Sequence, residues 1–255
     1  MKLPIGVQIY SVRDFAMADL ESTLKEISSF GYDGIELAGF YDKTPEEYAK
    51  LLEKYNLKAM SAHVSYYEMR DDMKKVIENC KTVGCKYIAI PWLDPDYRMD
   101  GIYGKETVDT IYKCAEMAKE ADMELLYHNH DFEFQKIDGE YMLDILYTKV
   151  PSLLVEQDTC WVQHGGEDPL KYLKKYANRT PVLHLKDYVG HKKDGNFQLR
   201  PNGYGEVDIK GMVEAAPQCG VEWLVVEQDH PSMDLNALEC AKKSIDYLKS
   251  IVKEV

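Results

Sequence analysis

The sequence predicts an α/β fold in which eight parallel strands and eight helices close into a single (β/α)8 barrel over residues 1–255. Apolar, strand-like segments alternate with amphipathic helical segments along the whole chain. Polar side chains follow four of these strands, and a barrel gathers such strand ends at one rim. The length of 255 residues is also typical of one complete barrel.

The first half of the chain contains four of the predicted strand and helix pairs. We expect strands at residues 5–10, 34–37, 58–64 and 87–90, with helices around residues 20–30, 44–55, 73–83 and 108–118. Two of these helices should stop at glycines, Gly31 and Gly84. The segment Thr44-Pro45-Glu46-Glu47 combines a capping threonine, a proline at the first helical position and a glutamate three residues after the cap. That combination is a specific signal for the start of a helix.

The second half repeats the alternation. The expected strands are an apolar run from Met123 that continues into Tyr127–Phe134, then residues 153–158, 181–187 and 224–229, and the expected helices lie around 141–147, 168–176, from 208 onward and 238–252. Residues 188–206 show no periodicity and contain four glycines. We expect them to form one long loop, which is a candidate lid.

An open, doubly wound sheet is the rival architecture. Helix-sized connections between strands require parallel pairing in both folds. However, no glycine-rich phosphate or dinucleotide fingerprint follows the first strand, where Ser11-Val12-Arg13-Asp14 stands instead. The barrel is therefore favoured.

The composition limits the partners and the compartment. There are 44 acidic and 31 basic side chains, and the net charge of -13 disfavours contact with nucleic acid or anionic lipid. No apolar stretch is long enough to span a bilayer, and no leader pattern precedes the first strand. The six cysteines lack C-x-x-C spacing, so we expect reduced thiols, a cytoplasmic location and no membrane partner. A homo-oligomer is compatible with the sequence.

Polar, titratable side chains stand two apart at the ends of strands five to eight. They are His128 and His130, Glu156 and Asp158, His184 and Lys186, and Glu227 and Asp229. Alternation along a strand would place each pair on one face. His128, His130, Asp158, His184 and Glu227 are therefore candidate ligands of a divalent ion such as Mn, Zn or Co. The alternative is a hydrogen-bonded polar cluster that plugs the top of the barrel.

Other residues near these strand ends have both a functional and a structural interpretation. Lys186 could bind a substrate oxygen, or it could form a salt bridge with Asp187 or Glu156. His63 could contact substrate at the end of strand three or be an ordinary buried histidine. Trp161 could be a platform for a sugar ring or could pack at the barrel mouth. Glu156 could support the ligands or pair with Lys186.

At these residues the chain resembles the sugar isomerase and epimerase family with the xylose-isomerase-like barrel, whose members are related to inosose dehydratase, tagatose 3-epimerase and the 3-keto-glycoside epimerases and eliminases. The resemblance runs along essentially the whole chain. It is carried by Gly6-Val7-Gln8-Ile9-Tyr10-Ser11-Val12-Arg13, Gly34-Ile35-Glu36-Leu37, Ser61-Ala62-His63, His128-Asn129-His130 with Asp131-Phe132-Glu133-Phe134, Glu156-Gln157-Asp158 to Trp161, His184-Leu185-Lys186-Asp187, Gly203-Tyr204-Gly205-Glu206-Val207-Asp208, and Glu227.

The resemblance implies a divalent metal held by Glu, Asp, His and Glu from strands five to eight. The last three match Asp158, His184 and Glu227. His128 stands in place of the first glutamate, which is half of the carboxylate pair that moves a proton in the epimerases. This departure weakens the case for two-carboxylate epimerisation and leaves room for elimination with a histidine base.

Three functions remain open on the sequence. The first is a metal-dependent sugar isomerase or epimerase that forms an enediolate from a ketose or keto-sugar, with Glu227 as the first candidate base and His128 or His130 on the other face. The second is a lyase or dehydratase that expels a β-leaving group from a 3-keto-sugar or inosose. The third is a non-catalytic carbohydrate-binding or subunit protein. No glycine-rich helix start or arginine cluster supports a phosphate on the substrate.

Overall fold

A closed barrel of eight parallel strands forms the centre of the protein. The computed structural model describes residues 3–252, so the ends of the expected 1–255 domain, residues 1–2 and 253–255, lie outside it. In chain order the barrel strands are β1 (Ile5–Gln8), β2 (Gly34–Ala38), β3 (Lys58–His63), β4 (Tyr87–Ile90), β5 (Glu124–His128), β8 (Leu154–Asp158), β9 (Val182–Leu185) and β12 (Trp223–Val226). The barrel closes where β1 pairs with β12. The predicted (β/α)8 architecture is confirmed.

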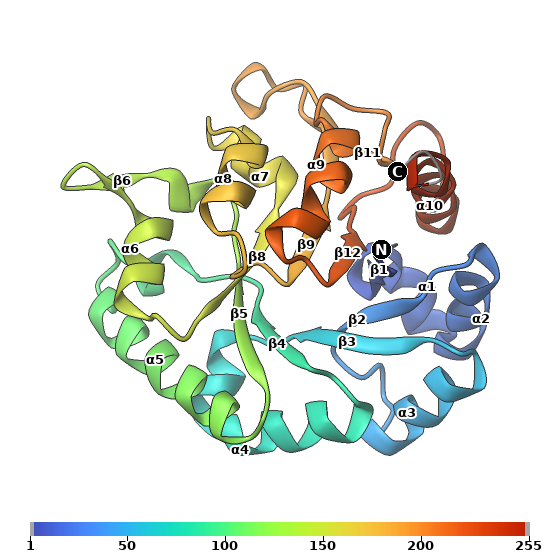
Figure 1. Ribbon diagram of the computed structural model, residues 1–255. Coiled ribbons are helices and arrows are strands. Elements are labelled where there is room, and N and C mark those ends of the chain that lie inside the picture. The colour runs from blue at the N-terminus through green and yellow to red at the C-terminus, as the bar shows by residue number, and fades with distance from the viewer. Residues whose placement is uncertain (1–2, 253–255) are drawn as a thin grey trace.

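Helices surround the barrel (Figure 1). Those that connect or follow the barrel strands are α2 (Leu20–Phe30), α3 (Pro45–Lys54), α4 (Tyr66–Val83), α5 (Gly104–Glu120), α6 (Met142–Lys149), α8 (Pro169–Lys175), α9 (Ile209–Ala215) and α10 (Ala237–Val252). Thr44 and Glu47 form the predicted capping box of α3. Gly31 and Gly84 end α2 and α4 with φ of 88° and 94°, a conformation that costs glycine little. No helix among residues 3–252 is long and apolar enough to cross a membrane.

The interior of the barrel has an apolar layer and a polar layer. The apolar layer is a cluster of buried side chains made by Met60, Tyr87, Ala89, Leu126, Val182 and Val225. Two residues further along three of these strands, and therefore on the same face, stand His128, His184 and Glu227. All three are buried. The change from apolar to titratable side chains takes place within one pleat repeat.

Several local elements differ from the sequence expectation. β5 ends at His128 and does not run on to Phe134. β1 ends at Gln8, where a 3-10 helix (Ile9–Val12) and α1 (Arg13–Ala18) take over. A further helix, α7 (Thr159–His164), begins directly after β8 because the Asp158 side chain accepts a hydrogen bond from the N–H of Trp161. A small hairpin of β6 (Lys136–Ile137) and β7 (Glu140–Tyr141) precedes α6.

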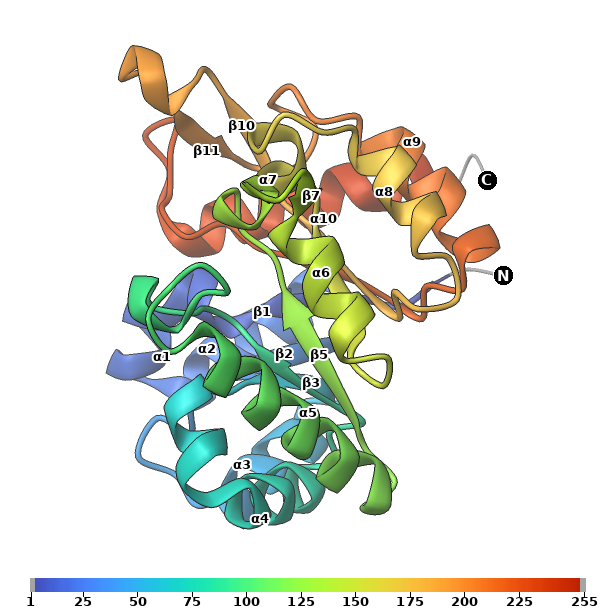
Figure 2. The same cartoon turned by 90° about the vertical axis from the view of Figure 1, so that its left-hand side faces the viewer.

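The expected irregular loop at residues 188–206 is partly a hairpin. β10 (Asp187–Val189) pairs with β11 (Gln198–Arg200) in antiparallel fashion, and the hairpin projects beyond the barrel (Figure 2). Asp187 fixes its base, because Oδ2 accepts hydrogen bonds from the N–H groups of Gly203 and Gly205 at 3.0 and 2.9 Å. A Cβ at position 205 would lie 2.2 Å from Asp187 Oδ1, so this close approach requires glycine.

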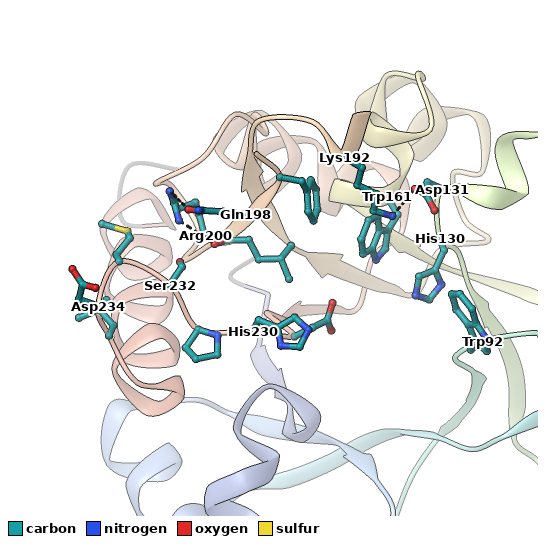
Figure 3. A pocket seen from close by; sticks show the side chains of 16 residues that line it. Trp92, His130, Asp131, Trp161, Lys192, Gln198, Arg200, His230, Ser232 and Asp234 are labelled. Carbon is teal, nitrogen blue, oxygen red and sulfur yellow. Dashed lines mark hydrogen bonds and ion pairs between the residues drawn. The ribbon is translucent and has the colours of Figure 1, made fainter. Parts of the chain in front are cut away.

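The hairpin and the segment after β12 enclose an outer chamber of about 940 Å³ (Figure 3). Trp161 and Phe197 line one wall, with ring centroids 5.6 Å apart, and Arg200 and Ser232 also line the chamber. Lys192 lies over the Trp161 ring and forms an ion pair with Asp131 at 2.7 Å. This contact joins the hairpin to the loop after β5.

Candidate active site

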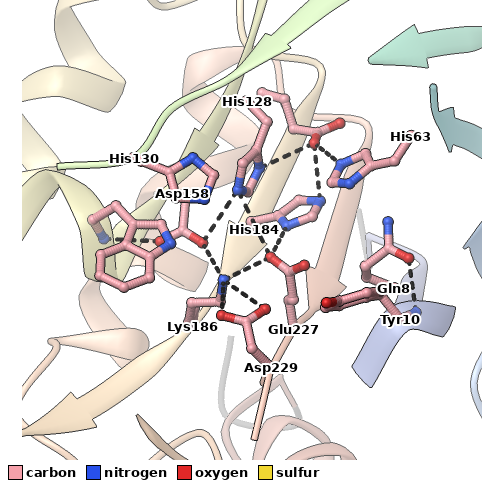
Figure 4. Close-up of polar contacts among 12 residues, drawn as sticks. Gln8, Tyr10, His63, His128, His130, Asp158, His184, Lys186, Glu227 and Asp229 are labelled. Carbon is pink, nitrogen blue, oxygen red and sulfur yellow. Dashed lines mark hydrogen bonds and ion pairs between the residues drawn. The ribbon is translucent and has the colours of Figure 1, made fainter. Parts of the chain in front are cut away.

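The carboxyl ends of four consecutive barrel strands bring together four of the five predicted metal ligands. His128 ends β5, Asp158 ends β8, His184 lies on β9 and Glu227 follows β12. One potential ligand atom from each lies within 4.8 Å of the others. All four side chains are buried (Figure 4). We call these residues the ligand group.

A second group of potential metal ligands lies beside the ligand group, and the two groups have His128 and His184 in common. It consists of His63, His128, Glu156 and His184. Glu156 Oε1 lies 2.5 Å from His63 Nε2, 3.2 Å from His128 Nδ1 and 3.2 Å from His184 Nε2. One carboxylate oxygen therefore faces three imidazole nitrogens.

The ligand group fits a divalent first-row ion. Two imidazoles and two carboxylates are a mixed nitrogen and oxygen set that suits Mn, Zn or Co, and thiolate is absent from the group. Asp158 Oδ2 is buried and receives no hydrogen bond from any described residue. Ligand bonds of about 2 Å place donor atoms within about 4 Å of one another, and the observed 4.8 Å limit is close to that requirement.

Lys186 supplies positive charge beside the carboxylates. Its Nζ lies 2.9 Å from Glu227 Oε2, 3.1 Å from Asp229 Oδ2 and 3.4 Å from Asp158 Oδ2. The predicted pairing with Asp187 or Glu156 is not formed in the described part of the chain, because those carboxylates bind hairpin N–H groups and histidines. The lysine side chain is buried, and an ammonium group in such a place requires the acidic partners it has.

The buried charges shift one another's pKa values. Burial, with the neighbouring Glu36 carboxylate, raises the pKa of Glu156 to about 7. Burial also raises the pKa of Asp158 to about 6, although Lys186 opposes this. Burial acts in the same direction on Glu36, but the His63 and His184 imidazoles outweigh it and lower the pKa of Glu36 to about 2. The pKa of Glu227 is lowered despite burial, mainly by Lys186 and His184.

His130, the fifth predicted ligand, lies outside both groups of potential ligands found within residues 3–252. The regular pairing of β5 with β8 ends at His128. The Asn129 side chain then accepts a hydrogen bond from the N–H of Asp158 at 2.9 Å and takes the place of a strand contact. His130 turns aside and stacks on Trp161, with ring centroids 5.5 Å apart. Its Nδ1 is buried and has no hydrogen-bond partner among the described residues.

An inner chamber of about 580 Å³ opens above the ligand group. His128, Lys186 and Glu227 line it, as do His63 and His130. Of the predicted substrate contacts, His63 and Lys186 therefore face the inner chamber, and Trp161 faces the outer one. The two chambers share four lining residues: Trp92, His130, Asp229 and His230.

Gln8, Glu36 and Asp229 also contact the site, and the sequence does not predict these roles. Glu36 is fully buried on β2, where Oε2 lies 2.6 Å from His184 Nε2 and accepts a hydrogen bond from Gln8 Nε2 at 3.0 Å. A glutamate in the middle of the apolar run Gly34–Ala38 is the signal that could have found it, because a lone buried carboxylate requires a partner. Its partner is 148 residues away in the chain.

Comparison with known proteins agrees with the barrel fold. Residues 24–251 match the family model described as xylose isomerase-like TIM barrel. An inosose dehydratase of Mesomycoplasma hyopneumoniae is 27% identical over 91% of this chain and 88% of its own. A sugar phosphate isomerase/epimerase structure from Parabacteroides distasonis has a TM-score of 0.83 at 22% identity, covering 97% of this chain and 98% of its own. The structure of an IolI protein with a bound zinc atom has a TM-score of 0.77 at 17% identity and covers 99% of both chains.

Proposed function

The chain belongs to the xylose isomerase-like TIM barrel family, and from this premise we propose that it is a divalent-metal-dependent lyase that removes water from a polyhydroxylated cyclic ketone of the inosose type. The observation that carries the proposal is the convergence of His128, Asp158, His184 and Glu227 beneath a chamber that three further imidazoles line. Proteins named inosose dehydratase resemble this chain over about nine-tenths of its length. This resemblance supports elimination more than isomerisation, which was the first of the three functions predicted from the sequence.

The ligand group would hold the ion. A divalent ion there would act as a Lewis acid on the ketone oxygen and make the adjacent C–H more acidic. Glu227 belongs to this group rather than acting as the base, because Lys186 and His184 both hold its Oε2, at 2.9 and 3.0 Å.

Two imidazoles are placed to move protons. His63 and His130 flank His128, with ring centroids 5.2 and 5.1 Å from it, on opposite sides (Figure 4). We assign removal of the α-proton to His130, because its side chain lines both chambers beside His128. His63, held on Glu156, passes a proton to the departing hydroxyl. Lys186 offsets the negative charge that develops on the substrate.

The proposed reaction balances without an oxidant or a reductant. The α C–H bond and the β C–O bond break, a C=C bond forms, and the proton and the hydroxide leave as one water molecule. The exposed Trp92 ring, shared by the two chambers, offers an apolar face to the C–H side of a polyol ring.

The test uses the purified full chain, loaded separately with Mn²⁺, Zn²⁺ and Co²⁺, and an inosose in D₂O. We expect a product lighter by one water with an enone absorbance, and its loss after chelation and in His130→Ala. The matched control is His230→Ala, which removes another imidazole lining the chambers but none beside His128. A full rate in the chelated protein would contradict the proposal, as would a wild-type chain that binds none of these ions.

Epimerisation is the second candidate, because two proton-transferring groups on opposite sides of one site are what inversion at a carbon requires. Deuterium incorporated into a recovered ketone, with no water lost, would assign the protein to this reaction. A non-catalytic chain would show neither exchange nor elimination.

A further inference from the structure

Each histidine of the ligand group has one ring nitrogen against a buried carboxylate and the other toward the ligand group. For His128, Nδ1 lies 3.2 Å from Glu156 Oε1, and Nε2 lies 3.8 Å from both Asp158 Oδ2 and Glu227 Oε2. For His184 the two nitrogens are exchanged. Its Nε2 lies 2.6 Å from Glu36 Oε2, and its Nδ1 lies 3.0 Å from Glu227 Oε2.

The two carboxylates behind the histidines have only neutral or imidazole partners. Glu36 and Glu156 have exposures of 0%, and no lysine or arginine forms an ion pair with either among residues 3–252. Burying two carboxylates carries a large desolvation cost unless hydrogen bonds and opposite charge offset it. The imidazole N–H groups are therefore the principal compensation for these two glutamates.

The contacts of Glu156 indicate where its neighbours' protons lie. Oε1 faces three imidazole nitrogens within 3.2 Å. A single proton on Oε1 could serve only one of them, so Oε1 must accept from the others. Oε2 has no hydrogen-bond partner among the described residues. The arrangement is satisfied when the rings donate and Glu156 accepts.

We propose that Glu156 and Glu36 are positioning residues that fix the tautomers of the two histidines, so that Nε2 of His128 and Nδ1 of His184 present their lone pairs to a divalent ion. A histidine that binds a metal through one nitrogen commonly donates the other N–H to a carboxylate, and that contact sets the orientation and basicity of the ring. The two histidines of this site use opposite nitrogens. This inference rests on the proposed metal site, because His184 Nδ1 lies 3.0 Å from the Glu227 carboxylate and would give up a proton held there when an ion binds. The tautomer of His128 can be measured without the ion.

The first experiment measures the tautomer directly in metal-free protein. Two-bond ¹H–¹⁵N correlation spectra of ¹⁵N-histidine-labelled full chain, assigned with His128→Asn, should show the His128 proton on Nδ1. In Glu156→Met this pattern should be lost. A wild-type His128 with its proton on Nε2 would overturn the proposal, since Glu156 would then be the donor.

The second experiment measures affinity for Co²⁺ alone by competition with a chelator. Glu156→Met and Glu36→Met should bind Co²⁺ about 10- to 100-fold more weakly than wild type. Glu156→Gln and Glu36→Gln, which keep an acceptor oxygen, should recover part of the loss and remain informative if the methionine variants fail to fold.

Glu133→Gln is the matched control. Glu133 is also a buried carboxyl at this end of the barrel, but its partners are the Tyr127 hydroxyl and the N–H of His130, and no imidazole ring. We expect near wild-type affinity. An equal loss in the control, or unchanged affinity in both methionine variants, would refute the positioning role. A wild-type chain that binds no Co²⁺ would instead refute the proposed function, and the spectra would still decide the tautomer of His128.

Discussion

The two layers inside the barrel differ in chemistry although the same strands build them. Leu126, Val182 and Val225 form part of the apolar layer, and His128, His184 and Glu227 stand two residues later on the same strands. Burial of the apolar layer stabilises the folded protein. The polar layer lowers the stability of the folded protein, because its buried charges must be desolvated and compensated. The side chains that stabilise the barrel and the side chains of the candidate site are therefore one pleat repeat apart, about 7 Å.

The largest effect is expected from breaking the polar layer. His184→Ala removes the ring that contacts Glu36 and Glu227. Loss of Lewis acid assistance is worth several kcal/mol, so kcat/KM for water loss should fall about 10³-fold. Metal content by mass spectrometry should fall with it. A variant that retains both metal and rate would show that the polar layer is only a structural plug.

The second largest effect is expected from a substitution in the apolar layer. Leu126 is fully buried between the strands, and the surrounding strands leave little room for collapse, so Leu126→Ala should lower the free energy of unfolding by about 4 kcal/mol. Urea unfolding measures this change, and Leu126→Met, which conserves volume, should cost less than about 1.5 kcal/mol. Metal binding by the folded alanine variant should be unchanged. A drop in metal affinity would mean that the two layers are not independent.

The smallest effect concerns a buried carboxyl outside both layers. Burial raises the pKa of Glu133 from 4.5 to about 7, and the Tyr127 hydroxyl only partly offsets this. Between these two values the unfolded chain loses the proton while the folded chain keeps it. The contribution to stability is therefore present below about pH 4.5 and is lost as pH rises through about 7, with a size of about 3 kcal/mol.

Urea unfolding near pH 5 and near pH 8 tests this prediction. The difference in unfolding free energy between the two pH values should be smaller in Glu133→Gln than in wild type. Comparing wild type with the variant cancels the contributions of Glu156 and Asp158, which also have raised pKa values. An identical pH dependence in the two proteins would show that Glu133 does not titrate in this range.

The parts of the site that could be predicted from the sequence are those set by period-two alternation at strand ends. His184 and Glu227 directly follow apolar runs, Asp158 ends the strand that begins with such a run, and the barrel brings the three together. The placement of His130 could not be obtained this way. Asn129 replaces a strand contact by binding the N–H of Asp158, 29 residues later in sequence. Asparagine is uncommon in strands, and this was the only local sign that β5 would end at His128.

Features that depend on contacts across the barrel also could not be predicted from the sequence. Glu36 belongs to the first quarter of the chain, and its histidine partner lies on β9. The hairpin at residues 187–200 was expected as a loop because its strands have three residues each, too few for a periodic pattern. The glycines that mark it, such as Gly205, reflect contact with Asp187 and not the absence of structure.

The start of α7 has a consequence for ion selectivity. Asp158 Oδ1 is held by the N–H of Trp161 at 2.9 Å, so only Oδ2 is free to coordinate. A carboxylate held in this way favours monodentate coordination through the oxygen that carries no hydrogen bond. Calcium prefers six to eight oxygen ligands and often uses bidentate carboxylates. With two imidazoles and one aspartate held in this way, the proposed metal site is expected to favour first-row ions over calcium, in part through a hydrogen bond made to begin a helix.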